Sequence, residues 1–139
     1  MSDAGYPGTG TYKALLVQTS VRLACTTANC SGGTSEHLDW VLKANTTYQR
    51  TTGVTVLTTN ANGIFVFGTL TNPISTGVAG WWTGINANWT FNGACTGNAW
   101  NSTAGNALYG DPNVSTSGAL SAGPDGCTTT GSKLLCIQQ

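Results

Sequence analysis

The sequence predicts an α+β domain in which short antiparallel strands combine with one or two helices and a long loop region. Residues 12–17 form a strand-like segment that ends in an apolar run, and residues 36–42 carry the pattern of a capped amphipathic helix. Short strand-like runs between turn residues then lead into the tract 90–127, which has little regular pattern. The 139 residues suffice for one hydrophobic core, so we expect a single domain over residues 1–139.

The helix is predicted from its cap, its charges and its apolar face. Thr34 or Ser35 can cap its first turn, which contains Glu36, and Lys43 lies near its end, as the helix dipole favours. One apolar face is marked by Leu38, Val41 and Leu42.

Short strands are expected in five further places, each bounded by turn residues: 48–50, 54–57, 64–67, 81–85 and 133–137. The last of these should close the sheet. Within the strand 81–85 we expect Trp82 to be buried, and Trp40 on the helix should be half-buried.

The tract 90–127 is long for a segment without regular structure inside a compact domain. Such loops are functional or disordered, or the assignment of elements is wrong. Cys95 and Cys127 lie near its two ends and argue against disorder.

The five cysteines indicate a disulfide framework. A zinc site is not predicted, because the chain has one His and no C-x-x-C pair. A bridge between Cys25 and Cys30 would close a short local loop.

The composition favours an extracellular protein. Only 7% of the residues are charged, the net charge is zero, and no charged residue occurs between Arg50 and Asp111. Such a surface suits either a neutral exported domain or a subunit that packs against copies of itself. There is no basic stripe for nucleic acid and no apolar run of about 20 residues for a membrane span. No signal peptide is visible, so an export signal or lipid anchor would lie outside this chain.

No catalytic constellation is predicted. Glu36, His37 and Asp39 are near neighbours on the expected helix, so their side chains would point to different faces. The carboxylates are too few and scattered for a glycosidase pair, and no phosphate-binding loop is present. We therefore expect neither an enzyme nor a cofactor.

Several segments carry a family resemblance. Residues 10–16, Trp82-Thr83-Gly84, Cys95, Trp100, Cys127 and Leu135-Cys136-Ile137 resemble endostatin, a variant of the C-type lectin-like fold. Residues 24–33, 35–43 and 59–65 resemble more specifically the endostatin-like domain of leptospiral surface lipoproteins, a family of unknown function. The fold class implied is C-type lectin-like.

The resemblance implies two long-range bridges. Cys95 should pair with Cys127, and Cys136 should pair with a cysteine in a first helix that would precede residue 12. The chain is therefore expected to be trimmed within that helix, which leaves Cys136 either a buried free thiol or bonded to a partner outside this chain.

The calcium site of true C-type lectins is not expected here. Asp111 and Asn113 could donate oxygens, but calcium takes about six to eight, usually from several carboxylates. The second half of the chain offers only Asp111 and Asp125.

Ligand binding is expected on the face formed by the long loops. The candidate residues combine apolar rings with polar edges, and they are Trp89, Asn98, Trp100, Asn101, Asn106, Tyr109, Asp111 and Asn113. For the two tryptophans the competing interpretation is packing against the Cys95–Cys127 bridge.

The leading functional hypothesis is a non-enzymatic adhesin-like domain of a bacterial outer-surface lipoprotein that contacts host matrix or complement proteins. The alternative is a structural subunit that assembles into a sheath, fibre or surface layer. A lectin is a third and weaker reading.

Overall fold

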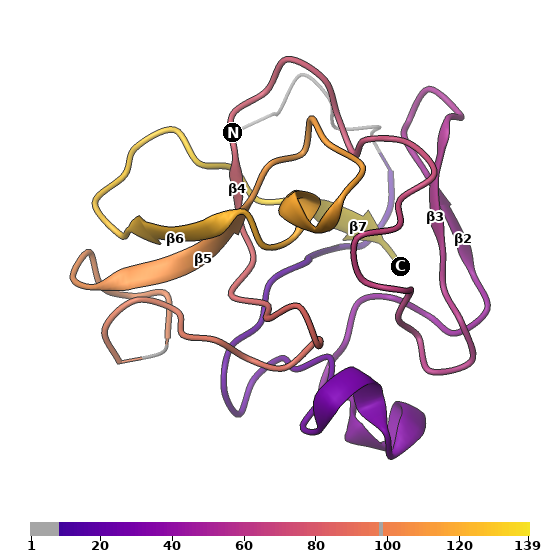
Figure 1. The fold of residues 1–139 in the computed structure, drawn as a ribbon, viewed down its shortest axis with the longest axis horizontal. Helices are drawn as coiled ribbons and strands as arrows, with labels where there is room; N and C mark the ends of the chain where they lie inside the picture. Colours follow the sequence, from indigo (N-terminus) through magenta and orange to yellow (C-terminus); the bar gives the residue numbers. More distant parts are fainter. Residues whose placement is uncertain (1–8, 98) are drawn as a thin grey trace.

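The computed structural model describes residues 9–97 and 99–139. Its regular elements are short and joined by long loops (Figure 1). The strands are β1 (Tyr12–Ala14), β2 (Thr47–Gln49), β3 (Thr55–Thr58), β4 (Trp81–Trp82), β5 (Asn106–Gly110), β6 (Gly123–Gly126) and β7 (Cys136–Gln138). Three 3₁₀ turns complete the described elements: η1 (Ala28–Cys30), η2 (Gly33–Glu36) and η3 (Ser117–Ala119).

The strands form three small antiparallel sheets, with the orders β1-β7, β2-β3 and β4-β5-β6. The first sheet joins the two ends of the described chain, because Tyr12 pairs with Gln138 and Ala14 with Cys136. The segment before β7 also bridges to β4 through Lys133 and Trp81. Residues 133–138 thus connect two sheets rather than closing one.

The predicted α+β fold class, with the helices of a C-type lectin-like fold, is wrong. The described residues contain only 3₁₀ turns and no α-helix. Where the helix 36–42 was expected, Leu38 forms an antiparallel bridge with Leu23, and Asp39 adopts a left-handed φ of 44°.

Tertiary contacts explain why this helix does not form. The Glu36 carboxylate accepts backbone hydrogen bonds from Thr26 and Thr27, and Asp39 forms ion pairs with Lys13 and Arg22. The next three residues, 40–42, are all buried in succession instead of presenting one face. Helix propensity is a weak prior that such contacts override.

Two other elements also differ from expectation. Residues 64–67 form no strand, although Ile64 and Phe65 are buried. The tract 90–127 holds β5, η3 and β6, so it is more regular than its polar composition suggested.

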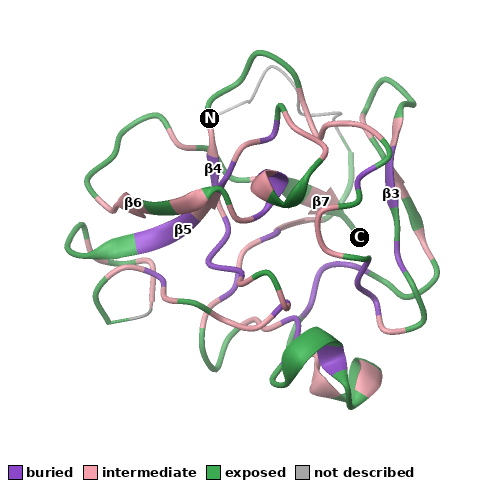
Figure 2. Ribbon diagram, viewed as in Figure 1, coloured by how far each residue is buried: buried purple, intermediate pink, exposed green. Residues whose placement is uncertain are grey.

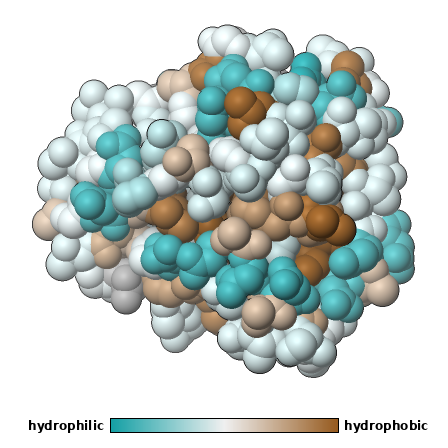
Figure 3. All heavy atoms as spheres, in the orientation of Figure 1, coloured by the Kyte–Doolittle hydropathy of each residue, from teal (hydrophilic) through white to brown (hydrophobic). Residues whose placement is uncertain are grey.

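The core is built from loops as much as from strands (Figure 2). Its largest fully buried side chains include Trp81, Trp89 and Ile85, and only the first of these lies in a strand. The surface in Figure 3 is mostly pale, near-neutral in hydropathy, as expected for a chain with so few charges. No helix among the described residues has the length and apolar character needed to cross a membrane.

Candidate functional site

Two disulfides hold the loops in place, and both were expected. Cys25–Cys30 closes a short ring at η1, and Cys95–Cys127 joins the ends of the long tract across 32 residues of sequence. Cys136 is the remaining cysteine; its thiol is free and exposed. The expectation of a buried thiol at this position is therefore wrong, whereas an external partner stays a prediction.

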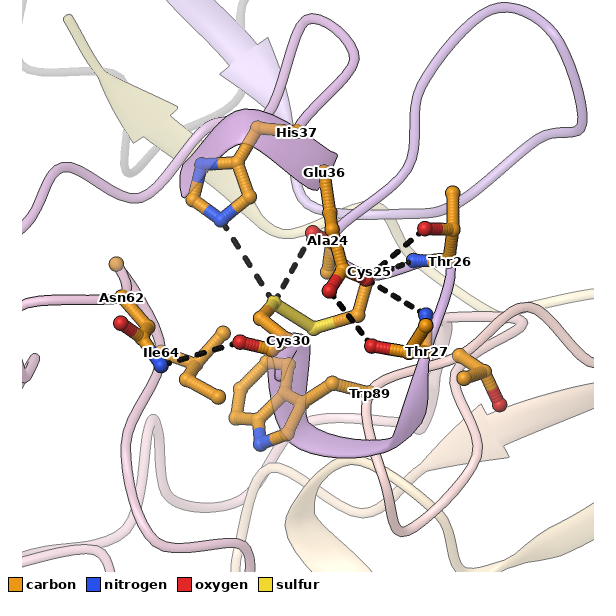
Figure 4. The surroundings of a disulfide bond; sticks show 12 residues. Ala24, Cys25, Thr26, Thr27, Cys30, Glu36, His37, Asn62, Ile64 and Trp89 are labelled. Carbon is orange, nitrogen blue, oxygen red and sulfur yellow. Dashed lines mark hydrogen bonds between the residues drawn. A yellow bond between two sulfur atoms is a disulfide. The ribbon is translucent and has the colours of Figure 1, made fainter. Parts of the chain in front are cut away.

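The Cys25–Cys30 bridge is buried beneath polar groups that bind one another (Figure 4). The Glu36 carboxylate accepts hydrogen bonds from the backbone and hydroxyl groups of Thr26 and Thr27 and from the backbone N–H of Gly32. These bonds, above all that from the Thr27 hydroxyl, lower the pKa of Glu36 to about 2. Glu36 is thus an internal acceptor that ties η1 to η2.

His37 and Asp39 are also engaged in the structure. The His37 Nε2 atom lies 3.9 Å from the Cys30 sulfur, and partial burial lowers the pKa of His37. Hydrogen bonds from Lys13 and then Arg22 lower the pKa of Asp39. The described residues include no group of three or more His, Cys, Asp or Glu side chains that could hold a metal ion.

Among the predicted binding residues, Trp89 lies in the core rather than on a surface that could contact a ligand. Its side chain is 0% exposed, its indole N–H donates to the Phe65 carbonyl at 3.1 Å, and its ring packs edge-on against Phe65, Phe67 and Trp40. Trp89 is therefore a core residue.

Asp111 and Asn113 bind each other and a neighbouring loop. The Asn113 side-chain oxygen accepts from Gly77 N–H, and its amide donates to the Val78 carbonyl and to Asp111. Their polar groups hold the turn after β5 against residues 77–78.

The other candidates lie around the β4-β5-β6 sheet. Asn101 is exposed beside the half-buried Trp100. Asn106 begins β5 and lines an open cavity of about 340 Å³ together with Asn92, Gly93, Ala107, Leu108 and Pro124. Tyr109 lies in β5 and is half-buried. Asn98 lies outside the described residues.

Three half-buried aromatic residues lie in this sheet or beside it, and we call Tyr109, Trp82 and Trp100 the aromatic row. Tyr109 is the direct cross-strand partner of Trp82, and the ring centroids of Trp82 and Trp100 are 5.8 Å apart with a tilt of 54°. Glycines make room on both sides of Trp82. A Cβ atom at Gly80 would lie 3.0 Å from the Tyr109 ring, and one at Gly84 would lie 3.1 Å from the Trp100 ring.

Trp82 is half-buried rather than in the core as expected, so it was not among the candidate site residues. Successive side chains of a strand point to opposite faces, so adjacent Trp81 and Trp82 cannot both face the core. Trp81 takes the inner position, 2% exposed, with its N–H bonded to the Ala119 carbonyl. Two adjacent tryptophans in one strand therefore predict that one of the two rings points away from the core.

The indole N–H groups separate Trp82 from the other tryptophans. Four of the five tryptophans donate to backbone carbonyls: Trp40 to Gly63, Trp81 to Ala119, Trp89 to Phe65 and Trp100 to Val17. In the described part of the chain, the Trp82 N–H and the Tyr109 hydroxyl have no such partner, and neither atom is buried. The aromatic row therefore presents two hydrogen-bonding groups to solvent.

The sequence comparisons place the chain in a family. Residues 1–117 match the model of a family described as "Protein of unknown function (DUF1554)". No curated protein and no solved structure matches the chain significantly. This match neither supports nor contradicts the resemblance to endostatin, which stays a prediction. Because the matched residues span most of the sequence, the chain belongs to the DUF1554 family.

Proposed function

We propose that this chain is a non-catalytic binding domain of a bacterial surface protein that contacts host matrix or complement proteins through its long-loop face. The observation that carries the proposal is the aromatic row, of which Trp100 and Tyr109 lie between Cys95 and Cys127. Half-buried Trp and Tyr side chains are enriched where proteins bind partners, because they combine apolar area with a polar atom. The host partner and the surface location come from the resemblance alone.

Binding suits this face better than catalysis. The two carboxylates of this face, those of Asp111 and Asp125, accept hydrogen bonds from their own chain. Catalytic groups need instead to reach a substrate at hydrogen-bonding distance. The aromatic row offers apolar contact area and two hydrogen-bond donors, a combination that is common on surfaces that bind other molecules.

The test is a pull-down from host serum and matrix extract with immobilised wild-type protein and a Trp82→Ala/Tyr109→Ala variant. We expect the wild type to capture host proteins and the double variant to lose them while keeping its melting temperature. Val66→Ala is the matched control, because Val66 is a 72% exposed apolar residue outside the face. Equal capture by all three proteins would refute this binding face, and no capture by any would refute the function.

A second candidate, self-assembly, is favoured by a different surface. Val78 and Leu134 are 44% and 54% exposed, and both line a small apolar pocket of about 80 Å³ whose lining includes Trp81. Near-zero net charge gives little repulsion between copies. Light scattering after size exclusion should then show oligomers of the wild type and a monomer for a Leu134→Asp variant. A wild type that stays monomeric at high concentration would rule the assembly out.

A further inference from the structure

We propose that Asn92 is a site of spontaneous modification, at which the side-chain amide is lost and a mixture of aspartate and isoaspartate forms. The sequence contains two Asn-Gly pairs, Asn62-Gly63 and Asn92-Gly93. Glycine after asparagine favours this reaction, because a residue without a side chain lets its backbone nitrogen approach the asparagine side chain closely. The two pairs have opposite surroundings in the structure, so we expect only the second to react in the folded protein.

The reaction uses only the chain itself and water. The Gly93 nitrogen gives up its proton and attacks the carbonyl carbon of the Asn92 side chain. A new C–N bond closes a succinimide ring, and the C–N bond to the side-chain amide breaks and releases ammonia. Water then opens the ring at either carbonyl and leaves aspartate, or isoaspartate with the backbone running through the former side chain. Because no partner takes part, the modification is independent of the proposed function.

The Asn92-Gly93 pair is open to this reaction. Asn92 is exposed, and the Gly93 N–H has no hydrogen-bond partner in the described part of the chain. A Cβ atom built at Gly93 would meet no other heavy atom within 4 Å, so there is room for the ring. The Asn92 amide donates one hydrogen bond, to the Asn86 side-chain oxygen at 2.6 Å. This contact is exposed and water can replace it at little cost, which frees the Asn92 side chain to turn towards Gly93.

The Asn62-Gly63 pair is held by the core instead (Figure 4). Gly63 is buried, and its N–H already donates to the Asn60 carbonyl at 3.0 Å. The Asn62 amide donates to the Cys30 carbonyl at 3.2 Å. A Cβ atom at Gly63 would lie 2.7 Å from the His37 ring, so a succinimide has little room. Both bonds must open before Asn62 can react, which should make it slower than Asn92 by roughly tenfold or more.

The product changes both the charge and the backbone of this loop. Asn92 lies within the stretch 51–110, which contains no charged residue, so a carboxylate there is the first charge of the stretch. Its oxygen would face the Asn86 side-chain oxygen, which accepts from the Asn92 amide before the reaction. Isoaspartate also lengthens the backbone between two bridges, Ile85–Phe91 and Ala94–Ala107. We therefore expect the modified protein to unfold at a lower denaturant concentration.

The test is incubation of the folded wild-type protein at mildly alkaline pH, followed by peptide mapping with mass spectrometry. We expect the peptide with Asn92 to gain the mass difference between an NH₂ and an OH group. This gain should be faster at higher pH, because the Gly93 nitrogen must lose its proton. An acidic form should appear on ion exchange and elute with the Asn92→Asp variant. Asn62 should keep its amide over the time in which most of Asn92 reacts.

Two comparisons make the result specific. Asn92→Gln keeps an amide but would have to close a larger and less favourable ring, so this variant should lack the early acidic form. In denaturant with the bridges reduced, neither pair is held by the fold, and Asn62 should react as fast as Asn92. The inference is overturned if Asn92 keeps its amide in the folded protein, if Asn62 reacts equally fast there, or if Asn62 stays unreactive in denaturant. The peptide map of the wild type decides the matter even where a variant fails to fold.

Discussion

Several bulky residues in this protein have a left-handed backbone conformation that is unfavourable for residues with a large side chain. Trp89, Cys95 and Trp100 have φ values of 69°, 60° and 51°, in the left-handed region that bulky residues rarely adopt. Trp89 is kept there by four side-chain contacts, its N–H bond to Phe65 and three ring contacts. Such strain persists only where the surrounding packing over-determines it.

The two tryptophans with opposite environments should respond differently to truncation. Trp89→Ala removes a fully buried ring and leaves the Phe65 carbonyl unpaired, so we expect a loss of about 3–5 kcal/mol in the free energy of unfolding. Trp82→Ala is the matched control, because its ring is half-buried and its N–H bonds to nothing in the described chain. Urea denaturation measures both, and an equal loss in the two variants would contradict the assigned burial.

Glu36 should make stability depend on pH in the acid range. Its pKa is lowered from 4.5 to about 2 in the folded state, so its bonds stabilise the fold fully above the unfolded pKa. That stability is lost as the pH falls from about 4.5 towards 2 and the folded carboxylate becomes protonated. We expect Glu36→Gln to unfold at lower denaturant at pH 7 and to lose less than the wild type on acidification.

Denaturation midpoints at a series of pH values measure this effect. Asp39 also has a lowered pKa and is unchanged in both proteins, so its contribution cancels in the difference between the two curves. Parallel curves from pH 7 to pH 2 would show that the Thr26–Thr27 bonds do not act on the carboxylate.

At the scale of elements, the short strands β5 and β6 are held together by contacts at their ends as well as by their own pairing. β5 and β6 pair over four residues, and Cys95–Cys127 ties the chain before β5 to the residue that follows β6. The backbone N–H of Cys127 also donates to Gly105, just before β5. The disulfide therefore closes the loop that presents Trp100 and Tyr109.

Removing the Cys95–Cys127 disulfide should lower the free energy of unfolding substantially, although the strands that it ties together are short. By loop-closure entropy, a Cys95→Ala/Cys127→Ala variant should lose about 3–4 kcal/mol, and a Cys25→Ala/Cys30→Ala variant should lose less from this term because its ring is shorter. Replacing the buried Cys25–Cys30 pair also loses packing, so reduction of the wild type, which keeps every cysteine in place, measures the joint effect of the two bridges without that loss. Unchanged stability of reduced protein would contradict a structural role for both bridges.

Sequence patterns located the strands better than the helix. The runs around residues 12, 48, 55, 81 and 136 all became strands, because alternation with turn residues is a local signal. The expected helix at 36–42 had equally good local signals, but Glu36 and Asp39 found partners 9 to 26 residues away. Nothing within the segment itself could reveal those partners.

The whole molecule combines an ordered core with little regular secondary structure. Most of its buried hydrophobic residues form one cluster drawn from loops and strands alike, and no α-helix occurs among the described residues (Figure 2). The loops are held together by disulfides, buried tryptophans and side-chain bonds to the backbone.

Far-ultraviolet circular dichroism should reflect this architecture. We expect a weak spectrum without the paired minima of α-helix, together with a strong near-ultraviolet signal from immobilised tryptophans. Heating or adding denaturant should remove the near-ultraviolet signal in one cooperative step. A pronounced helical spectrum would contradict the structure and restore the α+β interpretation.

The sequence alone determined the features that depend on local pattern and on composition: most strand positions, the short Cys25–Cys30 ring and the nearly uncharged surface. Only the tertiary structure decided which tryptophans are buried, where the polar side chains of Asp111 and Asn113 bind, and that residues 36–42 are not helical. The physical reason is the sequence distance over which each effect acts. Propensity and alternation act over a few residues, whereas burial and hydrogen-bond partners are set by segments that meet only after folding. Trp82 depends on both, because alternation places the rings of Trp81 and Trp82 on opposite faces of the strand, and the tertiary packing of Trp81 decided which ring is buried.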